Sequence, residues 1–467
     1  MPPGSAIYPV RTLILTFDWG TFEAMARFRW CATVILIFTS VLTVSAQFGP
    51  PEGNQIQAGG GVIWIDNRPF YSFRIRPEVA FGSIGIGLDL NLEFDSSGSL
   101  RKENFNEFSD YLSIIRYIRY GKETDQLYFK LGALDYVTLG HGSIINNYNN
   151  SPSFDSRHAG LQLNVNAPEW GLQSIYGTFG QASVAGLRSF VRPLRFTSLA
   201  DIPLLNELEV GVTYSADFND HATVVKRDSC PSCSGAVAKL GYFGAGTLSI
   251  LGADIGMPVV RGDFAGAELY ADFTKIIDFG GGVAVGVIVH IDGIPLVNFR
   301  GRLERRFNGE RYIPGYFGPL YEIERWNEIT SSAKSLTLNR LTTSSKGVYG
   351  DLLMRVINTF DIFGSYERLD GVPASGNFHL WTELFPRESP IVARAGYDKA
   401  AIRDFTDLFT TDDRALLYAE LGYKPYPFLI VSAVYRWTYT PIRSGDEIIG
   451  YAHQRKVEPR VEFIIAF

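Results

Sequence analysis

A histidine and a serine in a glycine-rich stretch are the first residues whose spacing suggests chemistry. Gly140-His141-Gly142-Ser143 places a base two residues from a hydroxyl, and a serine nucleophile needs such a base. A hydrolytic site also needs an acidic third member, and the sequence offers no G-x-S-x-G turn to present the serine. We therefore interpret the stretch as a tight loop, and we predict no enzyme activity and no catalytic residues.

The N-terminal region has the pattern of an export signal. Arg27 and Arg29 precede a mostly apolar run, and Val44-Ser45-Ala46 supplies small residues before an expected cleavage ahead of Gln47. This pattern predicts a signal peptide over 25–46, because the run is too short for a comfortable membrane span. Residues 1–24 have no interpretation of their own, and we expect them to be a misassigned extension ahead of the true start at Met25.

Cysteine usage agrees with an exported chain. Two of the three cysteines follow the signal, as Cys230 and Cys233 in a C-P-S-C motif, and we predict a local disulfide between them. A redox-active pair would lie in a thioredoxin-like βαβ pattern, and a zinc site would need a second pair; neither is present. The six histidines are scattered, so we expect no metal and no cofactor.

The composition favours strands over helices. The chain has 47 glycines, 24 tyrosines and 33 phenylalanines, yet charged residues still make up 20%. After residue 46 no apolar run approaches the length of a membrane helix. The mature charge, 40 basic residues minus 47 acidic ones, is −7, which argues against a nucleic-acid partner. A secreted β-sandwich or propeller is the alternative, although we find no repeat at a fixed period.

Alternation of apolar and polar residues is the strongest local pattern. In 83–95, residues Ile84 and Leu92 belong to an entirely apolar face, whereas Asp89 and Glu93 belong to the opposite face. A strand has a period of two, so one face is buried in an apolar medium and the other is not. Similar alternation recurs in 70–82, 207–218, 279–291 and 428–440, and more weakly elsewhere, to give about 20 strands.

The final segment carries the resemblance to a known family. Residues 457–467 read V-E-P-R-V-E-F-I-I-A-F, with Phe463 and Phe467 on an apolar face and a terminal aromatic residue. This segment resembles the closing strand of bacterial outer-membrane β-barrels, as found in Gram-negative cells. The resemblance implies that Phe463 and Phe467 form the signal read by the barrel-assembly machinery, and that outer-membrane lipids surround the protein.

The connections between expected strands alternate in length. Short ones lie near 121–125, 167–170, 386–390 and 424–427, and long polar ones at 96–108, 136–156, 219–235, 308–346, 400–414 and 441–452. Short periplasmic turns and long extracellular loops are typical of outer-membrane barrels. We therefore predict an all-β fold, a single transmembrane antiparallel barrel over 47–467. The strand count is 18 to 20, because 236–250 and 361–369 are poorly patterned and 188–197 sets the parity.

Basic residues are predicted to line the lumen. In 297–307, the apolar face must meet lipid, since a charge there costs about 2–4 kcal/mol at the bilayer midplane. Arg300, Arg302, Glu304 and Arg306 then point inward, and Arg74, Arg76 and Arg116 extend the same basic surface. Arginine rings favour anions. The alternative is that these groups pair across the lumen and select nothing.

Two functions remain open at this stage. Barrels of 16–18 strands leave an aqueous channel, so the first hypothesis is a porin-like channel for passive diffusion of small polar solutes. The second is a non-conducting barrel that binds, anchors or assembles surface material. Loop 308–346, the largest insertion, either folds inward as a constriction, binds a ligand outside, or packs as an extracellular cap. The sequence names neither a solute nor an oligomeric state.

Overall fold

The computed structural model describes residues 54–466 except 102–104, 106–110, 113, 152–157, 180–182, 220–246, 263, 295, 328–331, 357–358, 385–388, 413 and 445–446. The expected extension over 1–24, the signal peptide, the Cys230–Cys233 disulfide and Phe467 lie outside the described residues. Within them, no helix has the length and apolar character needed to cross a membrane.

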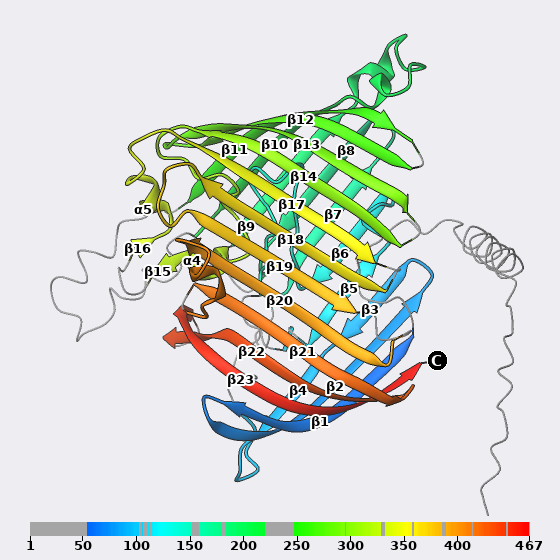
Figure 1. Ribbon diagram of the computed structural model, residues 1–467, viewed down its shortest axis with the longest axis vertical. Helices are drawn as coiled ribbons and strands as arrows, with labels where there is room; N and C mark the ends of the chain where they lie inside the picture. Colours follow the sequence, from blue (N-terminus) through cyan, green and yellow to red (C-terminus); the bar gives the residue numbers. More distant parts are fainter. Residues whose placement is uncertain are drawn as a thin grey trace, which may run out of the picture. The chain divides into compact units, whose positions relative to one another are not determined.

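One antiparallel sheet closes on itself as a barrel (Figure 1). Its first strand, β1 (Gln55–Ile65), pairs with its last, β23 (Glu447–Ala466). The sheet has 21 segments, but β3 (Ile84–Leu88) and β4 (Leu90–Phe94) both pair with β2 (Arg68–Phe81). They are one strand interrupted at Asp89, so the barrel has 20 strands. The predicted all-β single barrel is confirmed, at the upper end of the expected count.

The other elements follow in chain order. The remaining barrel strands are β5 (Ile115–Tyr120), β6 (Leu127–Gly132), β7 (Gly160–Asn166), β8 (Trp170–Tyr176), β9 (Val184–Val191), β10 (Glu209–Asp217), β11 (Leu248–Arg261), β12 (Ala265–Ile276), β13 (Gly281–Ile294), β14 (Val297–Asn308), β17 (Ser345–Val356), β18 (Phe360–Leu369), β19 (Gly376–Leu384), β20 (Ile391–Ile402), β21 (Ala415–Tyr426) and β22 (Leu429–Ser444). Short elements between them are η2 (Pro193–Phe196), η3 (Leu205–Glu207), α4 (Tyr321–Glu324), β15 (Trp326–Asn327), β16 (Ser332–Ala333), α5 (Ser335–Leu338) and η5 (Asp407–Phe409).

Strand periodicity separates an apolar outer face from a polar inner face. On β2, Tyr71 and Phe73 are 61% and 46% exposed on the outside, whereas Arg74 and Glu78 on the inner face are 8% and 4% exposed. Large apolar side chains remain exposed on the outside of most strands, as Val285 and Leu303 illustrate. Such a belt is stable only in contact with lipid, because water would leave it unburied.

The two ends of the barrel differ. β1 begins and β23 finishes at the same end of the barrel, here called the turn end. The opposite end, here called the loop end, carries the long connections after β6, β10, β14 and β20. Figure 1 shows the loop end on the left, with α4, α5, β15 and β16, and the C-terminus on the right. In outer-membrane barrels the long loops are extracellular.

Three details of the expected arrangement were wrong. Residues 441–452 are not a long loop, because the pairing of β22 with β23 continues through them and leaves two connecting residues. The strand expected at 188–197 is Val184–Val191, since Pro193 lacks the N–H that a ladder needs and begins η2 instead. The strand expected at 236–250 is Leu248–Arg261, which pairs with both β10 and β12.

Candidate functional site: a loop across the barrel lumen

The connection after β6 enters the barrel. Residues 133–151, here called the inward loop, are almost all buried, and Leu134, Ile145 and Tyr148 are completely so. The connection between β14 and β17, residues 309–344, packs against it and is here called the cap loop. Backbone hydrogen bonds join the two, including Asn146 N–H to the carbonyl of Phe317 at 3.1 Å. Loop 308–346 was a candidate to form a constriction in the lumen. The inward loop forms it instead, although its sequence indicated only an external connection.

The two loops share an apolar core with one side of the barrel wall. The wall contributes inner-face residues of β8 to β12, and the cap loop contributes Tyr312, Tyr316, Phe317 and Tyr321; the wall residues are Ile175, Val184, Leu248, Ile250 and Ile276. Burial of each large apolar side chain stabilises the arrangement by roughly 1.5–3 kcal/mol. The inward loop is therefore packed into the interior of the barrel.

Glycines on the inner wall make room for this core. A Cβ built at Gly252 would lie 2.8 Å from Cδ1 of Ile144, and one at Gly186 would overlap the side chain of Ile145. A Cβ at Gly256 would lie 3.2 Å from Nε2 of His141. Side chains at these positions would occupy the space that the inward loop takes. The wall sequence thus accommodates the loop at this place.

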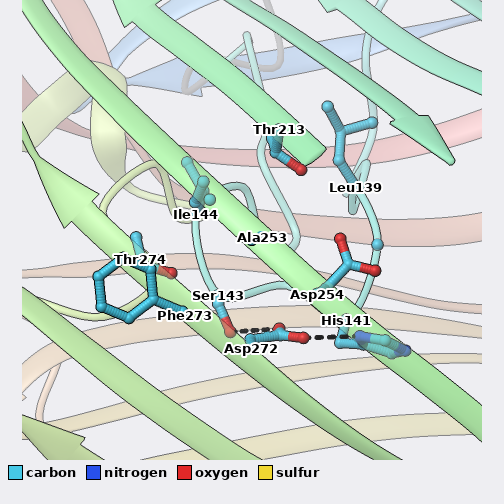
Figure 2. Close-up of a pocket in the computed structure, with 12 residues that line it drawn as sticks. Leu139, His141, Ser143, Ile144, Thr213, Ala253, Asp254, Asp272, Phe273 and Thr274 are labelled. Atoms are coloured by element: carbon cyan, nitrogen blue, oxygen red, sulfur yellow. Dashed lines mark hydrogen bonds and ion pairs between the residues drawn. The ribbon is translucent and has the colours of Figure 1, made fainter. Parts of the chain in front are cut away.

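His141 and Ser143 both bind one carboxylate of the wall (Figure 2). Asp272 on β12 lies 2.8 Å from Nδ1 of His141 and accepts a hydrogen bond of 2.5 Å from the Ser143 hydroxyl. The carboxylate therefore stands between the serine and the imidazole. A nucleophilic serine needs the imidazole to take its proton, and here the proton faces the carboxylate. The cluster anchors the loop.

The charge of His141 strengthens this anchor. Burial by itself lowers the pKa of His141, but hydrogen bonds to Asp272 and Glu268 outweigh it and raise the pKa to about 9. The imidazole also stacks on Tyr270 with ring centroids 4.0 Å apart. At neutral pH the ring is an imidazolium, so the anchor is an ion pair inside the barrel.

The basic residues predicted to face the lumen on β14, here called the β14 ladder, differ in their contacts. Arg302 donates to Asp351 at 2.6 Å and also to the carbonyl of His141, so it holds the inward loop. Arg306 pairs with Glu304 at 2.7 Å and with Glu367 at 2.7 Å. Arg300 is exposed, and no described residue pairs with it.

The other arginines predicted to face the lumen pair with neighbouring strands. Arg74 binds Asp89 through two hydrogen bonds, and Arg116, turned inward at a bulge of the β3–β5 pairing, donates to Glu78 at 2.9 Å. Arg76 on β2 reaches Glu462 on β23 at 2.7 Å, across β1. Glycines on the inner face of β1 leave room for this contact. Phe463, the expected assembly signal, is 48% exposed on the outer face.

A cleft remains beside the two loops. It lies at the loop end between the inward loop, the cap loop and β17 to β20, and its volume, with open solvent included, is about 610 Å³. His379 lines it, with Nδ1 2.6 Å from Asp398, and the Tyr136 ring of the inward loop lies 4.3 Å from the His379 ring. No sequence signal could have joined Tyr136 to this pair, because it lies more than 200 positions from both, whereas His379 and Asp398 lie 19 positions apart on neighbouring strands.

Comparisons with known proteins find similarity only among solved structures. No protein-family model matches the sequence, and no curated protein matches it. Among solved structures, the chain is similar to Wzi of Escherichia coli, described as a carbohydrate-binding barrel involved in capsule assembly, at 9% identity and a TM-score of 0.34 over 89% of this chain and 85% of that one. It is also similar to OccD3 (OpdP) of Pseudomonas aeruginosa, at 9% and 0.30 over 90% and 93%, and to OccAB2 of Acinetobacter baumannii, at 12% and 0.29 over 89% and 98%.

These scores are too low to carry an argument about function. The assignment rests on the molecule itself: a closed sheet of 20 antiparallel strands, an apolar belt facing outward, and charged side chains facing inward. Backbone groups in a bilayer must all be paired, and a closed barrel is the only sheet that achieves this. The chain is therefore a transmembrane β-barrel protein of the bacterial outer membrane.

Proposed function

We propose that the protein is an outer-membrane channel for passive diffusion of small polar solutes, narrowed by the inward loop. The observation that carries the proposal is the cleft beside the loop, together with the accessible polar wall below it. On that wall the side chains of Glu383 and Arg394 are 16% and 22% exposed. A Cβ built at Gly396 would have no other atom within 4 Å.

The size of the barrel supports a passage. Barrels of 16–18 strands already leave an aqueous channel, and this one has 20. The inward loop packs on the wall around β8 to β14, where the glycines and apolar residues lie. On the opposite wall, Glu383 of β19 and Arg394 of β20 pair with each other at 2.8 Å and keep part of their side chains exposed. Solutes would pass along this second side.

A second candidate function is a non-conducting barrel that binds, anchors or assembles surface material. The observation in its favour is the shared apolar core of the inward loop and the cap loop, which is built like a plug. The two functions differ in whether ions cross the barrel. Purified protein in a planar bilayer should give discrete conductance steps if it is a channel. A silent bilayer, with protein shown to be inserted and folded, contradicts the channel and supports the second function.

A measurement of ion preference tests which side chains line the conducting path. Arg300 is the exposed member of the β14 ladder, so Arg300→Glu should shift the reversal potential in a salt gradient toward cation preference. Arg68→Glu makes the same change of charge at an exposed arginine beside the β1–β2 turn, with whose side chain no described residue pairs, and is the control. Arg302 is unsuitable, because it holds the inward loop. An unchanged reversal potential in Arg300→Glu would remove Arg300 from the conducting path.

A further inference from the structure

A row of aromatic side chains crosses the accessible wall of the lumen. The strand register aligns Phe363 on β18 with Trp381 on β19, Trp381 with Gly396 on β20, and Gly396 with Tyr418 on β21. Residues opposite each other in neighbouring strands point to the same face, with Cβ atoms about 5 Å apart. Phe363, Trp381 and Tyr418, here called the aromatic row, therefore lie side by side in a row across the inner wall.

The row lies next to the constriction. Trp381 follows His379 by two residues on the same face of β19, toward the turn end, and His379 contacts Tyr136 of the inward loop. Phe363 also contacts the His379 ring, with centroids 5.5 Å apart. A solute that enters through the cleft beside the inward loop would meet the aromatic row directly after it.

Gly396 opens a notch in the row. A Cβ built there would have no other atom within 4 Å, whereas one at Gly286 on β13 would overlap the Tyr270 ring. Trp381 is half-buried beside the notch, and no described residue accepts a hydrogen bond from its indole N–H. By contrast, the indole N–H of Trp437 donates to the carbonyl of Asp412 at 2.9 Å. Trp381 thus offers both an apolar face and a free donor to the lumen.

Paired charges flank the aromatic row on both sides. Toward the loop end lie His379 and Asp398, 2.6 Å apart. Toward the turn end, Arg394 binds Glu383 at 2.8 Å and Glu420 at 3.3 Å. Because opposite charges compensate each other, these groups supply donors and acceptors without a strong pull on either ion sign.

We propose that the aromatic row is a binding site for a pyranose ring of a neutral saccharide, seated against Trp381 in the notch at Gly396. A pyranose has an apolar C–H face, which suits an aromatic ring, and a rim of hydroxyls that donate and accept. Glu383 and Arg394, whose side chains are 16% and 22% exposed beside the row, can hydrogen-bond to such hydroxyls. A planar aromatic solute would stack but leave these groups unmatched, and an anion would meet Glu383 and Glu420. The inference rests on the proposed function, because the ligand must reach the lumen.

Binding can be measured without conduction. The purified protein is kept in lauryldimethylamine oxide, which has no sugar headgroup, and its tryptophan fluorescence is titrated with maltohexaose, with benzoate and with glycerol. We expect a saturable change with maltohexaose alone. Trp381→Ala should weaken the affinity at least ten-fold, about 1.4 kcal/mol. Trp170→Ala, at an exposed tryptophan on the alternate face of β8, is the matched control and should bind as the wild type does.

A second variant keeps the inference testable if Trp381→Ala fails to fold. Gly396→Leu retains every tryptophan and fills the notch, so it should lose maltohexaose binding while the barrel stays intact on a gel. Binding that survives both substitutions, or binding of benzoate instead of maltohexaose, would overturn the saccharide site. Conductance without any saccharide binding overturns the site and leaves the channel standing. Saccharide binding with this residue dependence but no conductance overturns the channel and keeps the site.

Discussion

At the scale of single residues, Asp272 carries the attachment of the inward loop to the wall. It is 4% exposed and receives hydrogen bonds from both His141 and Ser143. Neither loop residue is a nucleophile or base in this arrangement. The same pair of residue types that suggests hydrolysis in the sequence instead holds a constriction in place, because the acidic partner stands between them.

Removing this carboxylate should loosen the constriction. In Asp272→Ala the His141 imidazolium loses its main partner, and breaking a buried ion pair on one side costs about 3–5 kcal/mol. We expect a larger and noisier single-channel conductance and faster chymotrypsin cleavage within 133–151. Asp292→Ala, at an exposed aspartate near the turn end of β13, is the control and should change neither readout. Unaltered conductance and cleavage in Asp272→Ala would place the anchor elsewhere.

The same anchor predicts a dependence on pH. The pKa of His141 in the folded protein, about 9, lies above its ordinary value of 6.5. Its contribution to loop docking, about 3 kcal/mol by the pKa difference, is therefore fully present below pH 6.5 and is lost as the pH rises through 9. Conductance should be constant from pH 5 to 6.5 and rise between pH 8 and 10. His141→Asn should show no such rise; a rise of equal size in that variant would assign it to another group.

At the scale of elements, the closure of the barrel depends on β1. Gly59 and Gly61 on its inner face lie against the backbone of β23, where an added Cβ would overlap carbonyl oxygens. Side chains of β2 therefore meet those of β23 over β1, as in the hydrogen bond of 2.9 Å from Ser72 to Glu458. The inner face of β1 is therefore covered by charged side chains of β2 and β23.

Gly61→Val should weaken this closure. The added side chain must push β1 away from β23 or displace Arg460, which is 2% exposed and paired with Glu458 and Glu462. We expect less assembled protein in the outer membrane and a melting temperature lower by several degrees. Gly396→Ala, another inner-face glycine substitution, meets no other atom within 4 Å and should assemble normally. Equal assembly of the two variants would show that the closure tolerates side chains at β1.

At the scale of the whole molecule, closure leaves no unpaired strand edge in the described sheet, since β1 and β23 pair with each other. All backbone groups of such a sheet are satisfied within it, so detergent has no edge to attack. The inward loop and the cap loop add an apolar core against one side of the wall, and Leu320 of the cap loop packs with Ala400 and Leu416 of β20 and β21.

This closure predicts heat-modifiable migration. The unboiled protein should run on a gel at a position different from that of the boiled protein, because the folded barrel resists dodecyl sulfate until it is heated. A variant without residues 447–466 lacks the closing strand and should run at one position before and after boiling. Identical migration of the intact chain, with solubility in detergent-free buffer, would contradict a membrane barrel.

Much of the barrel follows from the sequence because its main signal is local. Alternation with a period of two depends only on neighbouring residues, so the strand at 83–95 and its faces could be predicted before any partner was known. The expectation for 441–452 was wrong because a polar stretch looks the same in a loop and in a hairpin that extends beyond the membrane. Only the pairing of β22 with β23 distinguishes the two.

The site was decided by the tertiary structure. Whether 133–151 turns outward or inward depends on glycines and apolar residues of β9 to β12, which lie more than 30 positions away. The sequence placed arginines on one face but could not choose their partners; Arg76 meets Glu462, 386 positions later. The alignment of Phe363 with Trp381 and Gly396 exists only through strand register. Periodicity is a property of a single strand, whereas a lumen is built by contacts between strands. The sequence alone does not determine those contacts.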